Sequence, residues 1–180
     1  YGNRRVIVFD ANTGAYKRHW GAYGKRPDDS APNERTLTGP GTQQFNTVHG
    51  IAVSNDGRTV VAVSDEAPVV FLIDTTAGKV VCEVRLDGVP KPAQIARYSP
   101  DGSLVVISSL NSNMVSFIDA SFGEQAVVPV GKEPMDFAFR GDELFVGCQG
   151  DGSMHVIDIP KRRHKLSFKA GKGCESVGFF

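Results

Sequence analysis

The sequence has little of three things that often indicate a function: net charge, long apolar runs and cysteine. Lys and Arg together number 20, and Asp and Glu together also number 20, so no net field draws the chain to nucleic acid or to a membrane surface. No apolar run approaches the ~18 residues of a membrane-spanning helix. The sequence opens inside a repeat and shows no signal segment there, which leaves an upstream signal open. Hydrophobic residues nevertheless make up 41% of the 180 positions, which suffices for a packed core and argues against disorder.

The three cysteines, Cys82, Cys148 and Cys174, are odd in number and lack any C-x-x-C spacing. They therefore carry no recognisable redox or metal-binding motif. We expect them to behave as small buried hydrophobic residues, because free cysteine is among the most buried residue types.

Common catalytic and phosphate-binding motifs are missing as well. There is no Ser-His-Asp order and no nucleophile elbow. The glycine-rich residues 149–152 lie between predicted strands and do not precede a helix, so they form no phosphate-binding loop. The basic run at 161–165 lacks interleaved aromatic residues, and we expect a solvated hairpin tip there instead of a nucleic-acid interface.

What the sequence does contain is an internal repeat. Residues 99–102 (Ser-Pro-Asp-Gly) precede 115–119 (Val-Ser-Phe-Ile-Asp), and similar pairs of segments occur upstream and downstream. The turn aspartates Asp56 and Asp101 are 45 residues apart, and Asp101 and Asp142 are 41 apart. A period near 40 residues, built from short β-rich runs, is typical of β-propeller blades.

Each complete repeat contains four runs of β-branched and aromatic residues, separated by turns such as Asn-Asp-Gly and Pro-Asp-Gly. We predict one all-β domain, residues 1–180. Its parts are the outer strands of a split blade (1–22), an inserted loop (23–48), three blades (49–90, 91–132 and 133–172) and the first strand of a further blade (173–180).

This division predicts about three and a half four-stranded antiparallel blades of a larger propeller, with roughly six to eight blades. Asp10 and Asp74 are 64 residues apart, against 45 for the next interval, so the inserted loop adds 19 residues. The alternative is a closed four-bladed ring, which would lack one strand and leave edges exposed.

Residues 1–65 resemble the NHL repeat. The resemblance rests on the Gly-Asn-basic-apolar-Phe-Asp order of residues 2–10, on Trp20-Gly21, and on the His-Gly-Ile-Ala-Val run at 49–53. The family often has Pro where this chain has Val48.

Residues 49–180 resemble the YVTN family of 40-residue repeats. The apolar-Ser-apolar-Ile-Asp strand is clearest at 115–119, and Gly131 and Pro134 match the glycine and proline before a new blade. The name-giving tetrapeptide is degenerate at 61–64, 106–109 and 145–148. Both resemblances imply a propeller. Such proteins are often bacterial and exported, so the resemblance implies a periplasmic or secreted location.

One face of the predicted propeller gathers the candidate binding residues, because the inserted loop and the loops between second and third strands open on it. The residue seven positions before each turn aspartate begins an innermost strand at the mouth of the central channel, and these residues are His49, Gln94 and Met135. Glu175 aligns with them through Gly131 and Gly171. The candidate ligand-binding residues at this channel mouth are His49, Gln94, Asp65, Asn111, Asp151 and Glu175.

His49 supports the sharpest hypothesis. In NHL-type peptidylglycine lyases a His at the start of an inner strand binds zinc, so the resemblance implies that His49 is a metal ligand. Zinc takes three or four protein ligands, and among the equivalent positions only Glu175 could join it. The alternative is a hydrogen-bonded residue at the channel rim. On the upper loops, Asp65 and Asp151 could contribute to a calcium site or could be solvated loop charges.

The aspartates that end the third strands recur with the repeat, at Asp10, Asp74, Asp119 and Asp158. Because Asp accepts backbone N–H bonds at turns, the recurrence predicts a structural role.

The function that these observations favour is a non-enzymatic binding or scaffold module that recognises a ligand or protein at the channel mouth. One alternative is a propeller enzyme, lactonase-like or peptidylglycine-lyase-like, with zinc or another metal in the channel. A second is a redox-linked, quinoprotein-type subunit. We expect no nucleic-acid partner and no membrane insertion, and exposed blade faces favour self-association.

Overall fold

The computed structural model describes residues 5–21, 48–64 and 67–179, and these ranges consist mostly of antiparallel β-strands. A two-stranded hairpin comes first, with β1 (Arg5–Phe9) and β2 (Tyr16–Gly21). Three four-stranded sheets follow, each made of consecutive strands in chain order. Their strands are β3 (Val48–Val53), β4 (Thr59–Ser64), β5 (Val69–Asp74) and β6 (Lys79–Arg85); β7 (Ile95–Tyr98), β8 (Leu104–Ser109), β9 (Met114–Asp119) and β10 (Gln125–Pro129); β11 (Pro134–Arg140), β12 (Glu143–Cys148), β13 (Ser153–Asp158) and β14 (Arg163–Lys169).

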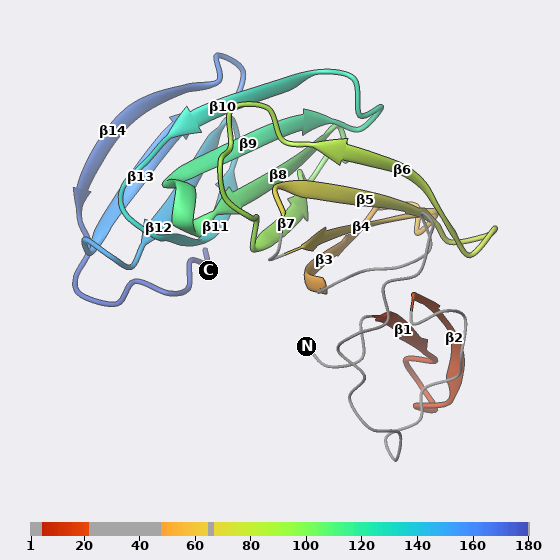
Figure 1. Ribbon diagram of the computed structural model, residues 1–180. Coiled ribbons are helices and arrows are strands. Elements are labelled where there is room, and N and C mark those ends of the chain that lie inside the picture. Colours follow the sequence, from red (N-terminus) through yellow and green to blue (C-terminus); the bar gives the residue numbers. More distant parts are fainter. Residues whose placement is uncertain (1–4, 22–47, 65–66, 180) are drawn as a thin grey trace.

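The three sheets stand side by side in chain order, as Figure 1 shows, with the β1–β2 hairpin beyond the first of them. The innermost strand of the first sheet lies beside that of the second, since β7 contacts β3, and the innermost strand of the third sheet, β11, contacts β8 of the second. Four-stranded antiparallel sheets packed face to face around an arc are the blades of a partial propeller, so the predicted fold class is confirmed.

Equivalent residues of the blades occupy equivalent positions. Asp74, Asp119 and Asp158 each end the third strand of a sheet and pair with the first residue of the second strand. The Oδ1 atom of Asp74 accepts the backbone N–H of Thr76 at 2.7 Å and that of Ala77 at 2.8 Å. The other three turn aspartates accept backbone N–H groups in the same way. The predicted structural role of these four residues is therefore confirmed.

Apolar side chains fill the spaces between neighbouring sheets. One cluster lies between the first and second sheets and includes Val63, Val84 and Ile107, each less than one-tenth exposed. A second lies between the second and third sheets, around Phe117 and Phe137. A third joins the outer side of the first sheet to Val6 of the hairpin. Burial between blades, rather than within one, thus holds the arc together.

The predicted strand at residues 175–180 does not form in its described part. Residues 174–179 have no strand pairing, although the backbone N–H of Val177 donates to Oδ2 of Asp136 on β11 at 3.1 Å. The segment therefore lies against the third sheet, where a next inner strand would pack, but without a strand beside it to complete a ladder. Most of the predicted inserted loop, 23–48, lies outside the described residues.

None of the helices in the described ranges is long and apolar enough to cross a membrane.

Candidate functional site

The three predicted channel-rim residues occupy one structural position. Val48 pairs with Ser64 and Gly50 with Val63, so the intervening His49 forms a bulge in β3. Met135 forms the same bulge in β11, between Pro134 and Asp136. Gln94 stands directly before β7, where its backbone N–H donates to the carbonyl of Ser108 at 2.9 Å. The prediction that His49, Gln94 and Met135 are equivalent is confirmed by this register.

His49 and Gln94 lie together across the boundary between the first two blades. The His49 Nδ1–H donates to the backbone carbonyl of Gln94, with 3.2 Å between the two heavy atoms. A Cβ atom built on Gly50 would lie 2.4 Å from the same carbonyl oxygen. Glycine at position 50 therefore allows β7 to approach β3 closely enough for the His49 contact to form.

An open groove of about 510 Å³ runs along β3 and β7. Its walls combine polar side chains, chiefly His49, Asn55 and Gln94, with the apolar side chains of Ile51 and Val53. The side chain of Val53 is 53% exposed. The groove therefore offers both hydrogen-bonding groups and apolar surface to a molecule lying along the inner strands.

A second polar contact joins the inner strands of the second and third blades. Arg97 on β7 extends a guanidinium to Asp136 on β11, with 2.7 Å between Nη2 and Oδ1, and it also donates to the carbonyl of Phe137. The Asp136 side chain is only 10% exposed and additionally accepts the N–H groups of Phe137 and Val177. The inner strands are thus tied in series, β3 to β7 through His49 and β7 to β11 through Arg97.

Of the other four predicted site residues, the three that the structure describes lie apart from the contact between His49 and Gln94. Asp151 is a turn residue whose carboxylate accepts the N–H of Lys132 at 3.0 Å and the N–H of Ser153 at 3.1 Å. The Ser153 hydroxyl, followed by the Lys132 amide, lowers the pKa of Asp151. Asn111 lies in the short 3₁₀ turn Leu110–Ser112, and Glu175 is exposed in the segment beyond β14. Asp65 lies outside the described residues.

Among the predicted site residues that the structure describes, the contact found is the one between His49 and Gln94. In the described part of the chain, no group of three or more His, Cys, Asp or Glu side chains is placed to hold a metal ion. The zinc or calcium predicted from the sequence stays a prediction, with His49 as the residue to test.

Burial changes the proton affinity of two groups near these contacts. Removal from water, helped by the nearby Asp56 charge, raises the pKa of Tyr98 in the groove to about 12. Burial likewise raises the pKa of the Cys148 thiol to about 11. Tyr98 is therefore a neutral hydroxyl at physiological pH, and Cys148 is an unreactive thiol that packs in the second core cluster.

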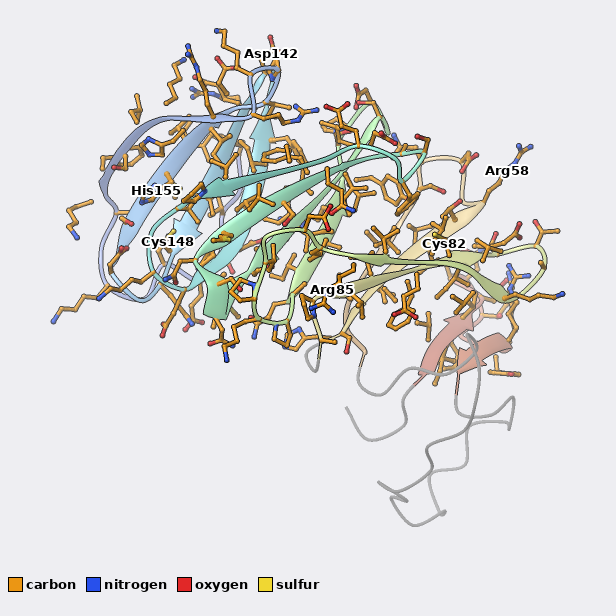
Figure 2. All side chains as sticks on the ribbon, turned by 45° about the horizontal axis from the view of Figure 1, so that its top comes forward. Arg58, Cys82, Arg85, Asp142, Cys148 and His155 are labelled. Atoms are coloured by element: carbon orange, nitrogen blue, oxygen red, sulfur yellow. The ribbon has the colours of Figure 1, made fainter. Side chains whose placement is uncertain are left out.

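Cys148 on β12 and His155 on β13 lie within the third sheet (Figure 2). A Cβ atom on Gly131 would lie 2.6 Å from the Ser153 hydroxyl and 2.8 Å from Nε2 of His155. Gly131 matches the glycine expected before a new blade, and close packing leaves no room for a larger residue at this position.

Arg97 and Asp136 were not predicted as site residues. The sequence does show a charged residue within the innermost strand of two consecutive repeats. It is the positive Arg97 in the second repeat and the negative Asp136 in the third. The bonding partner could not be read from that pattern, because it depends on how neighbouring blades approach one another.

Comparison with known proteins identifies the fold and not a family. No family model matches the chain, and no curated protein matches it. The β-propeller domain of Cps50 (Swd1) from Myceliophteria thermophila has a TM-score of 0.68 and 17% identity, over 96% of this chain and 51% of that one. Hydrazine synthase from Kuenenia stuttgartiensis has a TM-score of 0.65 and 23% identity, over 72% of this chain and 38% of that one. The chain therefore spans about half or less of either structure, and the likeness shows a propeller fold alone.

Proposed function

We propose that the chain is a binding or scaffold propeller module and that the groove along β3 and β7 recognises an extended segment of a partner protein. The observation that carries this proposal is the groove itself, which is open and has mixed polar and apolar walls. Enclosed pockets suit small ligands, whereas an open groove between strands suits an extended polypeptide.

The chemistry of the wall supports the same proposal. The polar residues of the inner strands, His49 and Arg97, already bond to neighbouring blades, so they hold the groove in one shape. A groove that is ordered before binding loses less entropy when its partner binds. Asn55 adds an exposed amide at one end, with Nδ2 donating to the Pro100 carbonyl at 2.9 Å.

The proposal also includes the repeat family and the location of the protein. In support of a YVTN-type repeat, the strand at 115–119 places Ser116 in the interior and Asp119 at the turn. That resemblance favours a periplasmic or secreted protein.

A peptide-display library panned against the purified chain tests the proposed recognition. We expect recovered peptides to bind with affinities that fall at least tenfold in His49→Ala and in Asn55→Arg, since both residues line the groove. His164→Ala and Asn12→Arg are the matched controls, because both residues are exposed and neither lines the groove.

Two results would contradict the proposal: recovery of no specific peptide, or equal binding by the groove variants and the controls. Metal content of the purified chain and of His49→Ala, measured in the same preparations, tests the predicted zinc or calcium. An equimolar metal lost in His49→Ala would favour the metal-dependent alternative over a peptide-binding groove.

A further inference from the structure

Two histidines lie close together where the third blade packs against the second. His155, labelled in Figure 2, lies on β13 and His164 on β14, with 5.0 Å between ring centroids and the ring planes tilted by 59°. His155 pairs with Val146, and His164 pairs with Ile157. Val146 and Ile157 belong to the apolar cluster between the second and third sheets. Because residues opposite one another on paired strands point to the same face, both histidines face the second blade.

The His155 ring is enclosed in a way that opposes its protonation. Its Nδ1 atom is buried and has no hydrogen-bond partner among the described residues, and a Cβ atom on Gly131 would lie 2.8 Å from its Nε2 atom. A neutral imidazole has one N–H donor, whereas the protonated ring has two. Protonation would therefore bury an unpaired N–H and a positive charge, and both are costly away from water.

The contact between the first and second blades has an uncharged residue at an equivalent position. Gln125 occupies in β10 the position that His164 occupies in β14, opposite the last apolar residue of the third strand. Its Nε2 donates to the carbonyl of Arg85 at 3.2 Å, and its Oε1 accepts the N–H of Asp87 at 3.1 Å. An amide side chain does not titrate, so these bonds between blades are independent of pH. The third blade has a titratable ring there instead, with the second ring of His155 beside it.

Charged groups flank the histidine pair on the side of the loop between β12 and β13. Asp151 carries a negative charge there, but its carboxylate already accepts the N–H groups of Lys132 and Ser153. Lys169 of β14 donates from Nζ to the backbone carbonyl of Asp151 at 3.0 Å. On β12, burial raises the pKa of the Cys148 thiol to about 11, so the thiol is neutral. Two lysines therefore accompany the one carboxylate on this side.

Arg162 is the charged group of the third blade on the other side of the pair. It lies in the turn between β13 and β14, and its guanidinium carbon is 5.1 Å from the centre of the Phe117 ring in the second blade. Asp119 and Glu124 line the same small pocket as Arg162, so two carboxylates accompany this cation. β10 contributes apolar side chains to the face that the histidines meet. The second blade therefore presents no charge from β10 itself.

These surroundings set the direction in which protons affect stability. Burial, followed by the proximity of His164, lowers the pKa of His155 below its ordinary value of 6.5, although Asp151 acts in the opposite direction. The folded chain thus binds this proton less readily than the unfolded chain. The stability that His155 contributes is therefore complete above about pH 6.5 and falls as the pH decreases below that value.

We propose that His155 and His164 form an acid-sensitive contact between the second and third blades, which holds at neutral pH and loosens when His155 is protonated. The outer strands β10 and β14, which contact one another, would separate first. The amide of Gln125 makes the contact between the first and second blades insensitive in the same range of pH. This inference does not rest on the proposed peptide recognition, because that groove runs along β3 and β7.

An NMR titration of the histidine rings in the purified chain tests the proposal at the residue itself. We expect the His155 ring to titrate below pH 6.5 in wild type. In His164→Gln its titration should move towards 6.5, because this substitution at an exposed position removes the neighbouring ring and copies the amide of Gln125. Titration of His155 at or above pH 6.5 in wild type, or an unchanged titration in His164→Gln, would overturn the proposal.

Urea unfolding at about pH 7.5 and about pH 5 tests the consequence for the fold. The midpoint of wild type should fall on acidification, and the fall should be at least halved in His155→Gln. Gln125→Ala is the matched control, because it removes uncharged hydrogen bonds between blades and should lower the midpoint equally at both pH values. An undiminished fall in His155→Gln would contradict the proposal. If that variant does not fold, the titration above decides, since it leaves position 155 unchanged.

Amide hydrogen exchange locates the change within the arc. After correction for the intrinsic pH dependence of exchange, acidification of wild type to about pH 5 should reduce protection in β10 and β14. Protection in β3 and β7 should change little, and His155→Gln should retain protection in β10 and β14. Equal loss of protection in all four strands would show that acid acts on the fold as a whole and not through this contact.

Discussion

At the scale of single residues, Asp119 shows why the recurring aspartates have a structural role. Its carboxylate accepts the backbone N–H of Ser121 at 2.8 Å and that of Glu124 at 2.6 Å. The Ser121 hydroxyl, followed by these amides, lowers the pKa of Asp119 from its ordinary value of 3.8 to about 2. Asp101 reaches about 2 through the hydroxyls and amide of Ser99 and Ser103.

These lowered pKa values predict how stability depends on pH. These carboxylates hold protons more weakly in the folded state than in the unfolded state. They therefore stabilise the fold fully above about pH 4, and this stabilisation is lost as pH falls towards 2. Urea unfolding of wild type should show a midpoint that falls across this window, and Asp119→Asn should show a smaller fall. Asp142→Asn, in an exposed two-residue turn, is the control. An unchanged pH profile in Asp119→Asn would contradict the turn-cap role.

Gly50 allows a second test at the residue scale. A Cβ at this position would lie 2.4 Å from a backbone oxygen of the next blade, which cannot move aside as a flexible side chain can. Gly50→Ala should therefore destabilise the chain by about 1–3 kcal/mol, the usual range for overpacking. Gly178→Ala, with no atom within 4 Å of the added Cβ, should be nearly neutral. Equal thermal midpoints for both variants would show that β3 and β7 do not approach as described.

At the scale of the strands, the contacts between inner strands are the features that position the groove. Arg97 and Asp136 join β7 to β11 at 2.7 Å with the carboxylate buried. The pair formed by Arg140 and Glu143 is nearly as short, 2.8 Å, but it lies on the surface within one hairpin. Burial, and not distance, should decide the difference in their energies.

A double-mutant cycle with Arg97→Met and Asp136→Asn measures the buried pair. Because the arginine side chain is 44% exposed, we expect a moderate coupling free energy of roughly 1–2 kcal/mol. The matched cycle with Arg140→Met and Glu143→Gln should give a clearly smaller coupling, because water screens an exposed ion pair. If the coupling free energy in the first cycle is no larger than in the second, the ion pair of Arg97 does not stabilise the contact between the blades.

The strands also show what could be predicted from the sequence. The spacing of Asp74, Asp119 and Asp158 predicted both the sheets and their register, because each aspartate caps a turn that local hydrogen bonds determine. The equivalence of His49 and Gln94 followed from their positions seven residues before the turn aspartates Asp56 and Asp101. Their contact, and that of Arg97 with Asp136, could not be predicted, because the distance between inner strands is set by side-chain packing between blades. The strand predicted at 175–180 failed in its described part because strand formation requires a pairing partner and not only a suitable sequence.

At the scale of the whole molecule, the arrangement of the blades follows from where apolar area is buried. Val84 and Val128, on the outer strands of the first two sheets, are each covered by the next sheet. The groove and the contacts between inner strands therefore both depend on one claim, that the three sheets pack in series as neighbouring blades of one arc.

Nuclear Overhauser contacts between assigned side chains of neighbouring sheets test that claim most directly. The account predicts contacts between first-sheet and second-sheet side chains of the first cluster, which includes Val84 and Ile107. It further predicts contacts between second-sheet and third-sheet side chains of the second cluster, which includes Phe117 and Phe137. It also predicts backbone contacts that pair Asp74, Asp119 and Asp158 with the first residues of their second strands. Backbone contacts in the stated register, accompanied by contacts between both pairs of sheets, are the expected result. Sheets without contacts between them, or aspartates paired at different positions in the three sheets, would contradict the propeller arc.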